Sequence, residues 1–166
     1  LSIPYMQEKK IGFKDIIEAY TKGDDSYKEL KKKCPLHDVV LSASVKHHPT
    51  PVQSAAYRIP KLWHGDLESQ EGKDLRVCSP NGTLFFVATK IMIDPQAGEI
   101  AVGRIFGGTM RKGTEINLIR AKQKGRVQQV FIMNGAKREI VDNIPAGNII
   151  AIGGVKTFPG ETLTVG

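Results

Sequence analysis

The sequence predicts a mainly β protein, an antiparallel β-barrel preceded by a small helical segment. Residues 11–48 have the apolar spacing of amphipathic helices, whereas short apolar segments separated by turn residues follow one another after residue 82. Hydrophobic residues make up 40% of the 166 residues, enough to build a buried core. We therefore expect three parts: helices in 1–48, a proline-containing connector in 49–81, and a β-barrel domain in 82–166.

The first helix is predicted from one apolar face. Phe13, Ile16, Ile17 and Tyr20 are spaced i, i+3, i+4 and i+7, so their side chains lie on the same side of a helix. Gly23 follows this pattern and is expected to end the helix.

The next two helices are predicted from their ends. Ser26 and Glu29 have the spacing of a capping box, and lysines at 31–33 would complement the negative end of the helix dipole. A further helix should begin near Pro35 and stop before Pro49. Its apolar stripe would consist of Leu36, Val39, Val40 and Ala43.

The segment 49–81 is predicted to be a connector because its prolines exclude a long helix. These prolines are Pro49, Pro51, Pro60 and Pro80. Trp63 is expected to anchor the segment, together with Leu62, by packing onto a neighbouring element.

The barrel is predicted from short β-favouring segments with turn residues between them, such as Asn134-Gly135 and Pro159-Gly160. The stretch 147–154 is almost continuously apolar, as expected for a strand buried on both faces. The candidate strands are 84–94, 99–106, 114–119, 126–133, 138–141, 148–152 and 162–165.

The glycine-rich stretch 103–118 raises the question of nucleotide binding. Gly108 and Gly113 have the spacing of a phosphate-binding loop, but Thr114 follows Gly113 directly, where such a loop needs a lysine. The residues after Thr114 favour a strand, so no helix N-terminus would face a phosphate. We expect the stretch to be strand, bend and strand, with Gly113 in a turn.

No catalytic or metal-binding residue is predicted. Cys34 and His37 have a Cys-x2-His spacing, but His47 would lie about 15 Å further along the same helix, too far to share a zinc ion. No local signature of a catalytic triad is present. The distant cysteines Cys34 and Cys78 indicate a reducing, cytosolic setting.

The N-terminus has neither a start methionine nor a signal peptide, and it looks like the middle of a longer chain. No apolar run approaches the roughly 20 residues that cross a membrane, so no membrane partner is expected.

The positive charge is concentrated in one segment. The formal net charge is +7, and residues 104–126 contain seven basic side chains and a single acid, Glu115. Such a cluster suits a polyanion, and the scarcity of aromatic residues favours contact with phosphates and sugars over base stacking. The alternative is a solvated rim that contacts no nucleic acid. The candidate RNA contacts are Arg111, Lys112, Arg120, Lys122, Lys124 and Arg126.

Segments taken in order along the chain resemble consecutive blocks of archaeal and eukaryotic elongation factor 2. The Gly103–Met110 region with Lys112 and Gly113 also resembles the second domain of translational GTPases in general, and two of the segments are shared with a spliceosomal relative. The segments are "IGFKDIIEAY", "KKKCPLHDVVL", "VKHHPTPVQ", "YRIPKLWHGD", "IMIDPQAGEIAVGRIFGGTMRKGTEINL" and "IPAGNIIAIGG".

The resemblance implies a fragment of a cytoplasmic GTPase that moves tRNA and mRNA through the ribosome. It implies that residues 1–48 are the helical end of the GTPase domain and that 82–166 are the second, barrel domain. The motifs for GTP and magnesium would lie before Leu1, so the fragment should hold no cofactor and be inactive alone.

The implied partners are small-subunit ribosomal RNA and the rest of the GTPase domain. Without that domain, the apolar faces of the helices could also lead to self-association of the fragment. The alternatives to an RNA-docking barrel are a structural spacer without RNA contact and the spliceosomal relative, which acts in RNA–protein remodelling.

Overall fold

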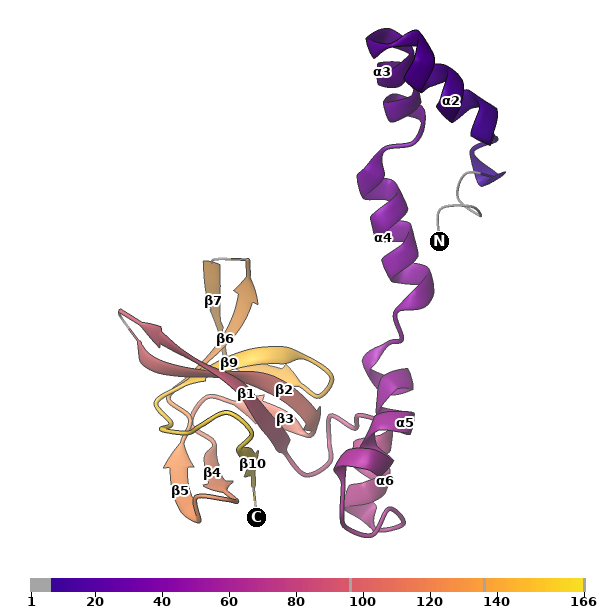
Figure 1. The fold of residues 1–166 in the computed structure, drawn as a ribbon. Helices are drawn as coiled ribbons and strands as arrows, with labels where there is room; N and C mark the ends of the chain where they lie inside the picture. The colour runs from indigo at the N-terminus through magenta and orange to yellow at the C-terminus, as the bar shows by residue number, and fades with distance from the viewer. Residues whose placement is uncertain (1–6, 96, 136, 166) are drawn as a thin grey trace. The chain divides into compact units, whose positions relative to one another are not determined.

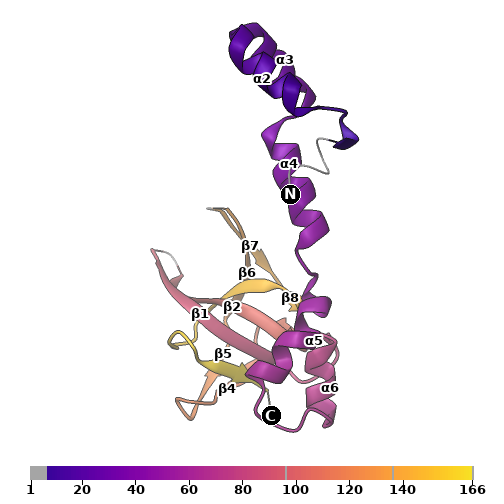
Figure 2. The same cartoon turned by 45° about the vertical axis from the view of Figure 1, so that its right-hand side comes forward.

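The computed structural model describes residues 7–95, 97–135 and 137–165 (Figures 1 and 2). Residues 1–6, on which the prediction of a mid-chain start depends, lie outside the described residues. The chain divides into two units, Leu1–His48 and Pro49–Gly166. No helix among the described residues is long and apolar enough to span a bilayer.

The first unit contains the helices α2 (Phe13–Lys22), α3 (Asp24–Lys33) and α4 (Leu36–His47). Gly23 has a φ of +90°, a conformation open to glycine, and it separates α2 from α3 as predicted. The predicted apolar faces are largely uncovered: Phe13 is 74% exposed, Tyr20 is 87% exposed, and no described residue of α4 is buried.

The predicted capping box of the second helix is wrong. The helix α3 begins at Asp24 with Gly23 in the N-cap position, so Ser26 lies inside the helix. Gly23 alone connects α2 to α3 and takes the N-cap position of α3, so Ser26 does not cap this helix. The lysines at 31–33 do lie in the last turn.

Two helices occupy the segment that was predicted to be a connector: α5 (Pro51–Leu62) and α6 (Gln70–Arg76). The N-cap of α5 is Thr50, whose hydroxyl accepts the Gln53 amide N–H while the Gln53 side chain accepts the Thr50 N–H. Pro51 takes the first helical position, where its missing N–H costs no hydrogen bond. Pro51 was expected to oppose a helix, but at this first position it favours one.

The helices α5 and α6 pack on the start of the barrel. Ala55, Ile59, Leu75 and Cys78 form a buried cluster there. The ring of Trp63 meets the ring of Phe85 edge to face, with 5.2 Å between the ring centroids, so Trp63 is the predicted packing anchor. Leu62 remains exposed.

The rest of the second unit is antiparallel sheet. Strands run in the order β5-β4-β10-β1-β2-β9-β6-β7, with β3 paired to β8 separately. Figure 1 accordingly shows β1 and β2 between the β4–β5 and β6–β7 hairpins. The strands are β1 (Phe85–Asp94), β2 (Gly98–Gly107), β3 (Thr109–Arg111), β4 (Glu115–Leu118), β5 (Gln123–Arg126), β6 (Gln129–Asn134), β7 (Lys137–Val141), β8 (Asn143–Pro145), β9 (Ile149–Gly153) and β10 (Thr162–Thr164).

One core unites these strands. Phe86, Ile105, Ile116, Ile150 and Leu163 are buried together although they come from β1, β2, β4, β9 and β10. The predicted mainly antiparallel β fold with preceding helices is therefore confirmed.

The strand predictions need two corrections, and one of the predictions holds. The predicted strand 126–133 corresponds mainly to β6: its first residue, Arg126, ends β5, and Val127 and Gln128 lie between the two strands. The strands β3 and β8 were not predicted, since three residues are too few to show an alternating pattern. The buried strand expected within 147–154 is β9, whose residues after Ile149 are buried.

Candidate nucleic-acid interface

The six candidate contacts are all exposed and come from the region of one hairpin. Arg111 ends β3, and Lys112 lies in the turn that leads into β4. Arg120 and Lys122 lie in the turn between β4 and β5, and the other two candidates, Lys124 and Arg126, belong to β5. We call Arg111, Lys112, Arg120, Lys122, Lys124 and Arg126 the basic edge, because β5 is the last strand at one side of the sheet.

The strand β5 directs two of its cations away from the core. A side chain at Gly125 would contact Val155, Leu118 and Ile116, so this position faces the barrel interior. Residues on either side of it alternate to the opposite face. Lys124 and Arg126 therefore project outward, where a ligand can reach them.

Arg126 joins β5 to the turn that carries Lys112. Its Nε donates a hydrogen bond of 3.2 Å to the carbonyl of Gly113, and the amide of Gly113 donates to Val127 across 2.8 Å. Gly113 has a φ of +84°, which suits the predicted turn. Arg111 and Lys112 are thereby held at the β5 end that carries Arg126.

Glu161, which was not predicted as a site residue, holds the tip of the β4–β5 hairpin. Glu161 is 0% exposed, and its carboxylate accepts the amide N–H groups of Arg120, Ala121 and Thr162 at 2.8, 3.1 and 3.1 Å. These charge-assisted bonds connect the β4–β5 turn to the start of β10. In the sequence, Glu161 is distinguished only by being the one acidic residue after Asp142.

Together these contacts arrange the cations along one hairpin. Arg111, Lys112 and Arg126 lie at one end of β5, and Arg120 and Lys122 lie near the other end. Four residues of β-strand span about 13 Å, which covers several phosphates of a nucleic-acid strand. Among the described residues, no ion pair involves a member of the basic edge.

The stretch 108–114 does not fit a nucleotide. The amides of Gly108, Lys112, Gly113 and Thr114 all donate to backbone carbonyls, at 2.8 to 3.2 Å. They are therefore engaged within the fold and not directed at a phosphate. The longer stretch 103–118 is strand, bend, strand, turn and strand, with Gly108 at a φ of +72° between β2 and β3 and Gly113 in the expected turn.

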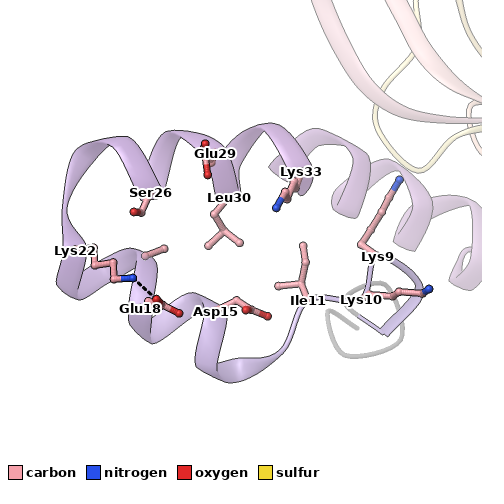
Figure 3. A pocket seen from close by; sticks show the side chains of 11 residues that line it. Lys9, Lys10, Ile11, Asp15, Glu18, Lys22, Ser26, Glu29, Leu30 and Lys33 are labelled. Carbon is pink, nitrogen blue, oxygen red and sulfur yellow. Dashed lines mark hydrogen bonds and ion pairs between the residues drawn. The ribbon is translucent and has the colours of Figure 1, made fainter.

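A hollow of about 420 Å³ lies between α2 and α3 (Figure 3). Figure 3 shows Leu30 of α3 pointing toward α2 within it. Its rim carries charges of both signs, so it complements neither an anion nor a cation. These charged residues are Lys9, Lys10, Asp15, Glu18, Lys22, Glu29 and Lys33, and Lys22 is paired with Glu18.

The histidines and cysteines form no metal centre in the described part of the chain. His37 and His47 lie at opposite ends of α4. Burial raises the pKa of the Cys78 thiol, and the nearby charge of Arg104 partly counteracts this effect. Cys78 is therefore kept protonated and suits a packing role.

Comparison with known proteins identifies relatives for both units. Residues 98–164 match the family model of elongation factor Tu domain 2, which agrees with the barrel of the second-domain type. The chain is similar to elongation factor 2 of Thermococcus sibiricus (47% identity over 164 residues), Pyrococcus furiosus (46% over 164) and Methanococcus vannielii (47% over 164). Each alignment covers 98% of this chain, which spans about a fifth (22%) of the relatives' length.

Proposed function

Because this chain belongs to the elongation factor 2 family, we propose that it is the docking part of a GTP-dependent translation factor that acts on the ribosome in the cytoplasm. In this proposal the basic edge binds phosphates of small-subunit ribosomal RNA. The barrel contributes contacts and no catalysis. GTP and magnesium would be bound by residues outside this chain, since the amides of Gly108, Lys112, Gly113 and Thr114 already donate to backbone carbonyls.

We further propose the domain assignment that the sequence suggests. Residues 1–48 would be the helical end of the GTPase domain, 49–81 the connection, and 82–166 the second domain. The exposed faces of α2 and α4 support this assignment, because apolar side chains such as Phe13 and Leu36 need a covering layer. The remainder of the GTPase domain would supply that layer.

The observation that carries the proposal is the fixed, outward arrangement of the basic edge. When the backbone that carries the cations is already held in place, binding costs less conformational entropy. Buried Glu161 holds the turn with Arg120, and the bond from Arg126 to Gly113 holds the other end. A merely solvating rim would not need either restraint.

Neutralising two cations of the hairpin tests this role. We expect the double variant Lys122→Asn, Lys124→Gln of the complete factor to bind small ribosomal subunits more weakly. If each lysine neutralises one phosphate, the slope of log affinity against log salt should flatten by about 1.4 to 1.8. Lys122 has a φ of +52°, so asparagine, which tolerates this conformation, preserves the turn.

The matched control is Lys90→Gln, Lys137→Gln, which removes the same charge from β1 and β7. This control should bind like the wild type. An unchanged slope in the Lys122, Lys124 variant would refute the docking role and favour a spacer without RNA contact. Equal weakening in both variants would mean that only the overall charge matters.

A further inference from the structure

One cation of the basic edge lies over an aromatic ring. The guanidinium carbon of Arg120 is 5.6 Å from the centroid of Phe158, within the range of a cation–π contact. Both side chains reach the surface: Arg120 is exposed, and Phe158 is 39% exposed. A large apolar ring is thus kept at the surface; along the chain, lysines follow Arg120 at 122 and 124, and another precedes Phe158 at 156.

Two other arginine–phenylalanine pairs in the barrel differ from this one. Arg138 lies over Phe131, but that ring is 1% exposed and Arg138 is paired with Asp94. Arg104 lies over Phe106, and both residues are half-buried. These pairs have packing roles, whereas the planar groups of Arg120 and Phe158 remain accessible.

The backbone under the Arg120–Phe158 pair is held rigidly. Glu161 accepts the amide N–H of Arg120 at 2.8 Å and lies three residues after Phe158. The amide of Glu161 in turn donates to the carbonyl of Phe158 at 3.2 Å, which closes the turn that carries the ring. Gly160 has no side chain, and a Cβ there would lie 3.6 Å from Nη1 of Arg120. The backbone that carries the two planar groups is therefore preorganised.

We propose that Arg120 and Phe158 form a stacking site for an unpaired base of RNA. Unpaired bases stack on aromatic rings and on arginine guanidinium planes, and neighbouring lysines can hold the adjoining phosphates. This inference rests on the proposed function, and it replaces the expectation from sequence that the interface makes phosphate and sugar contacts without base stacking. The sequence does not reveal this pair, because Phe158 lies more than thirty residues after the basic segment.

The test compares two RNA probes that differ by one base. One is a short duplex with a single bulged adenosine, and the other is the same duplex without the bulge. We expect the chain to prefer the bulged RNA. The variants Phe158→Leu and Arg120→Lys should lose about 5- to 100-fold in affinity for it and bind the plain duplex as before.

The salt dependence should stay unchanged in both variants, because neither removes a positive charge. Tyr57→Leu is the matched control: Tyr57 is an exposed ring on α5 with Arg58 6.0 Å from its centroid, and its replacement should leave the preference intact. Thermal unfolding of each variant checks that the fold is retained.

The outcomes separate the stacking site from the proposed function. If neutralising Lys122 and Lys124 weakens RNA binding but Phe158→Leu binds the bulged RNA like the wild type, stacking is refuted and docking stands. Equal affinity of the wild-type chain for both probes also refutes stacking. If neither the lysine variant nor Phe158→Leu changes binding, both proposals fail.

Discussion

A single buried carboxylate organises the part of the surface that we assign to RNA. The carboxylate of Glu161 is buried, and three amide N–H groups replace the water that it would otherwise bind. Its position could not be predicted from sequence, since its partners at Arg120 and Ala121 lie about forty residues away. The sequence shows the cluster of cations that we propose as the interface, but it does not show that Glu161 holds the turn that carries Arg120.

We expect Glu161→Ala to lower the free energy of unfolding by about 3 kcal/mol, because it leaves three buried donors without an acceptor. Glu161→Gln should cost about 1.5 to 3 kcal/mol, since the new NH₂ group would face an N–H donor. Urea denaturation of the chain measures both. Glu115→Gln, an exposed acid on β4, is the control and should change little. Wild-type stability of Glu161→Ala would contradict the assigned contacts.

At the level of elements, the sequence predicts best where local signals agree with the final packing. The helices α2 and α4 were predicted because glycine and proline mark their ends, and the long strands β1 and β2 because their segments are strongly β-favouring. The helix α5 was missed because Pro51 was taken as a breaker and not as a first-turn residue. The strands β3 and β8 depend on a partner distant in sequence, which no local pattern reveals.

The pairing of β1 with β2 makes a sharp prediction about one glycine. A Cβ at Gly103 would lie 2.0 Å from the carbonyl oxygen of Val87, beside the bulge between Ala88 and Lys90. We expect Gly103→Ala to destabilise the chain by at least about 3 kcal/mol, because the backbone of β1 must move. Gly125→Ala meets only side chains at 3.3 Å or more and should change stability by less than about 1 kcal/mol. Similar midpoints in urea for the two variants would contradict this view of the strand pair.

For the whole molecule, the two units differ in how they are stabilised. The second unit encloses a continuous core, whereas the described part of the first unit buries only Ile11 and Ala19. Most of the length of the elongation factor 2 relatives lies outside this chain. The helical unit thus presents the apolar surface that the proposed GTPase domain would cover.

If that surface stays uncovered, we expect the chain to associate with itself. The mean sedimentation coefficient should rise with concentration, and the variant Phe13→Ser, Tyr20→Ser should reduce the rise because both side chains are largely exposed. Ile93→Ser, which removes an 85% exposed side chain from β1, should leave association unchanged. A monomer at every concentration would contradict the hypothesis.

The strand order also has a consequence for how the protein is made. Within the sheet, β10 is the strand that joins β4 to β1, and it comes last in the chain among the described strands. During synthesis, the β4–β5 hairpin, which carries Lys122 and Lys124, therefore lacks the strand that joins it to the rest of the sheet until residues 162–164 leave the ribosome. Glu161 emerges just before them, so the tip of the β4–β5 hairpin and the carboxylate that holds it are completed together, at the end of translation of this segment.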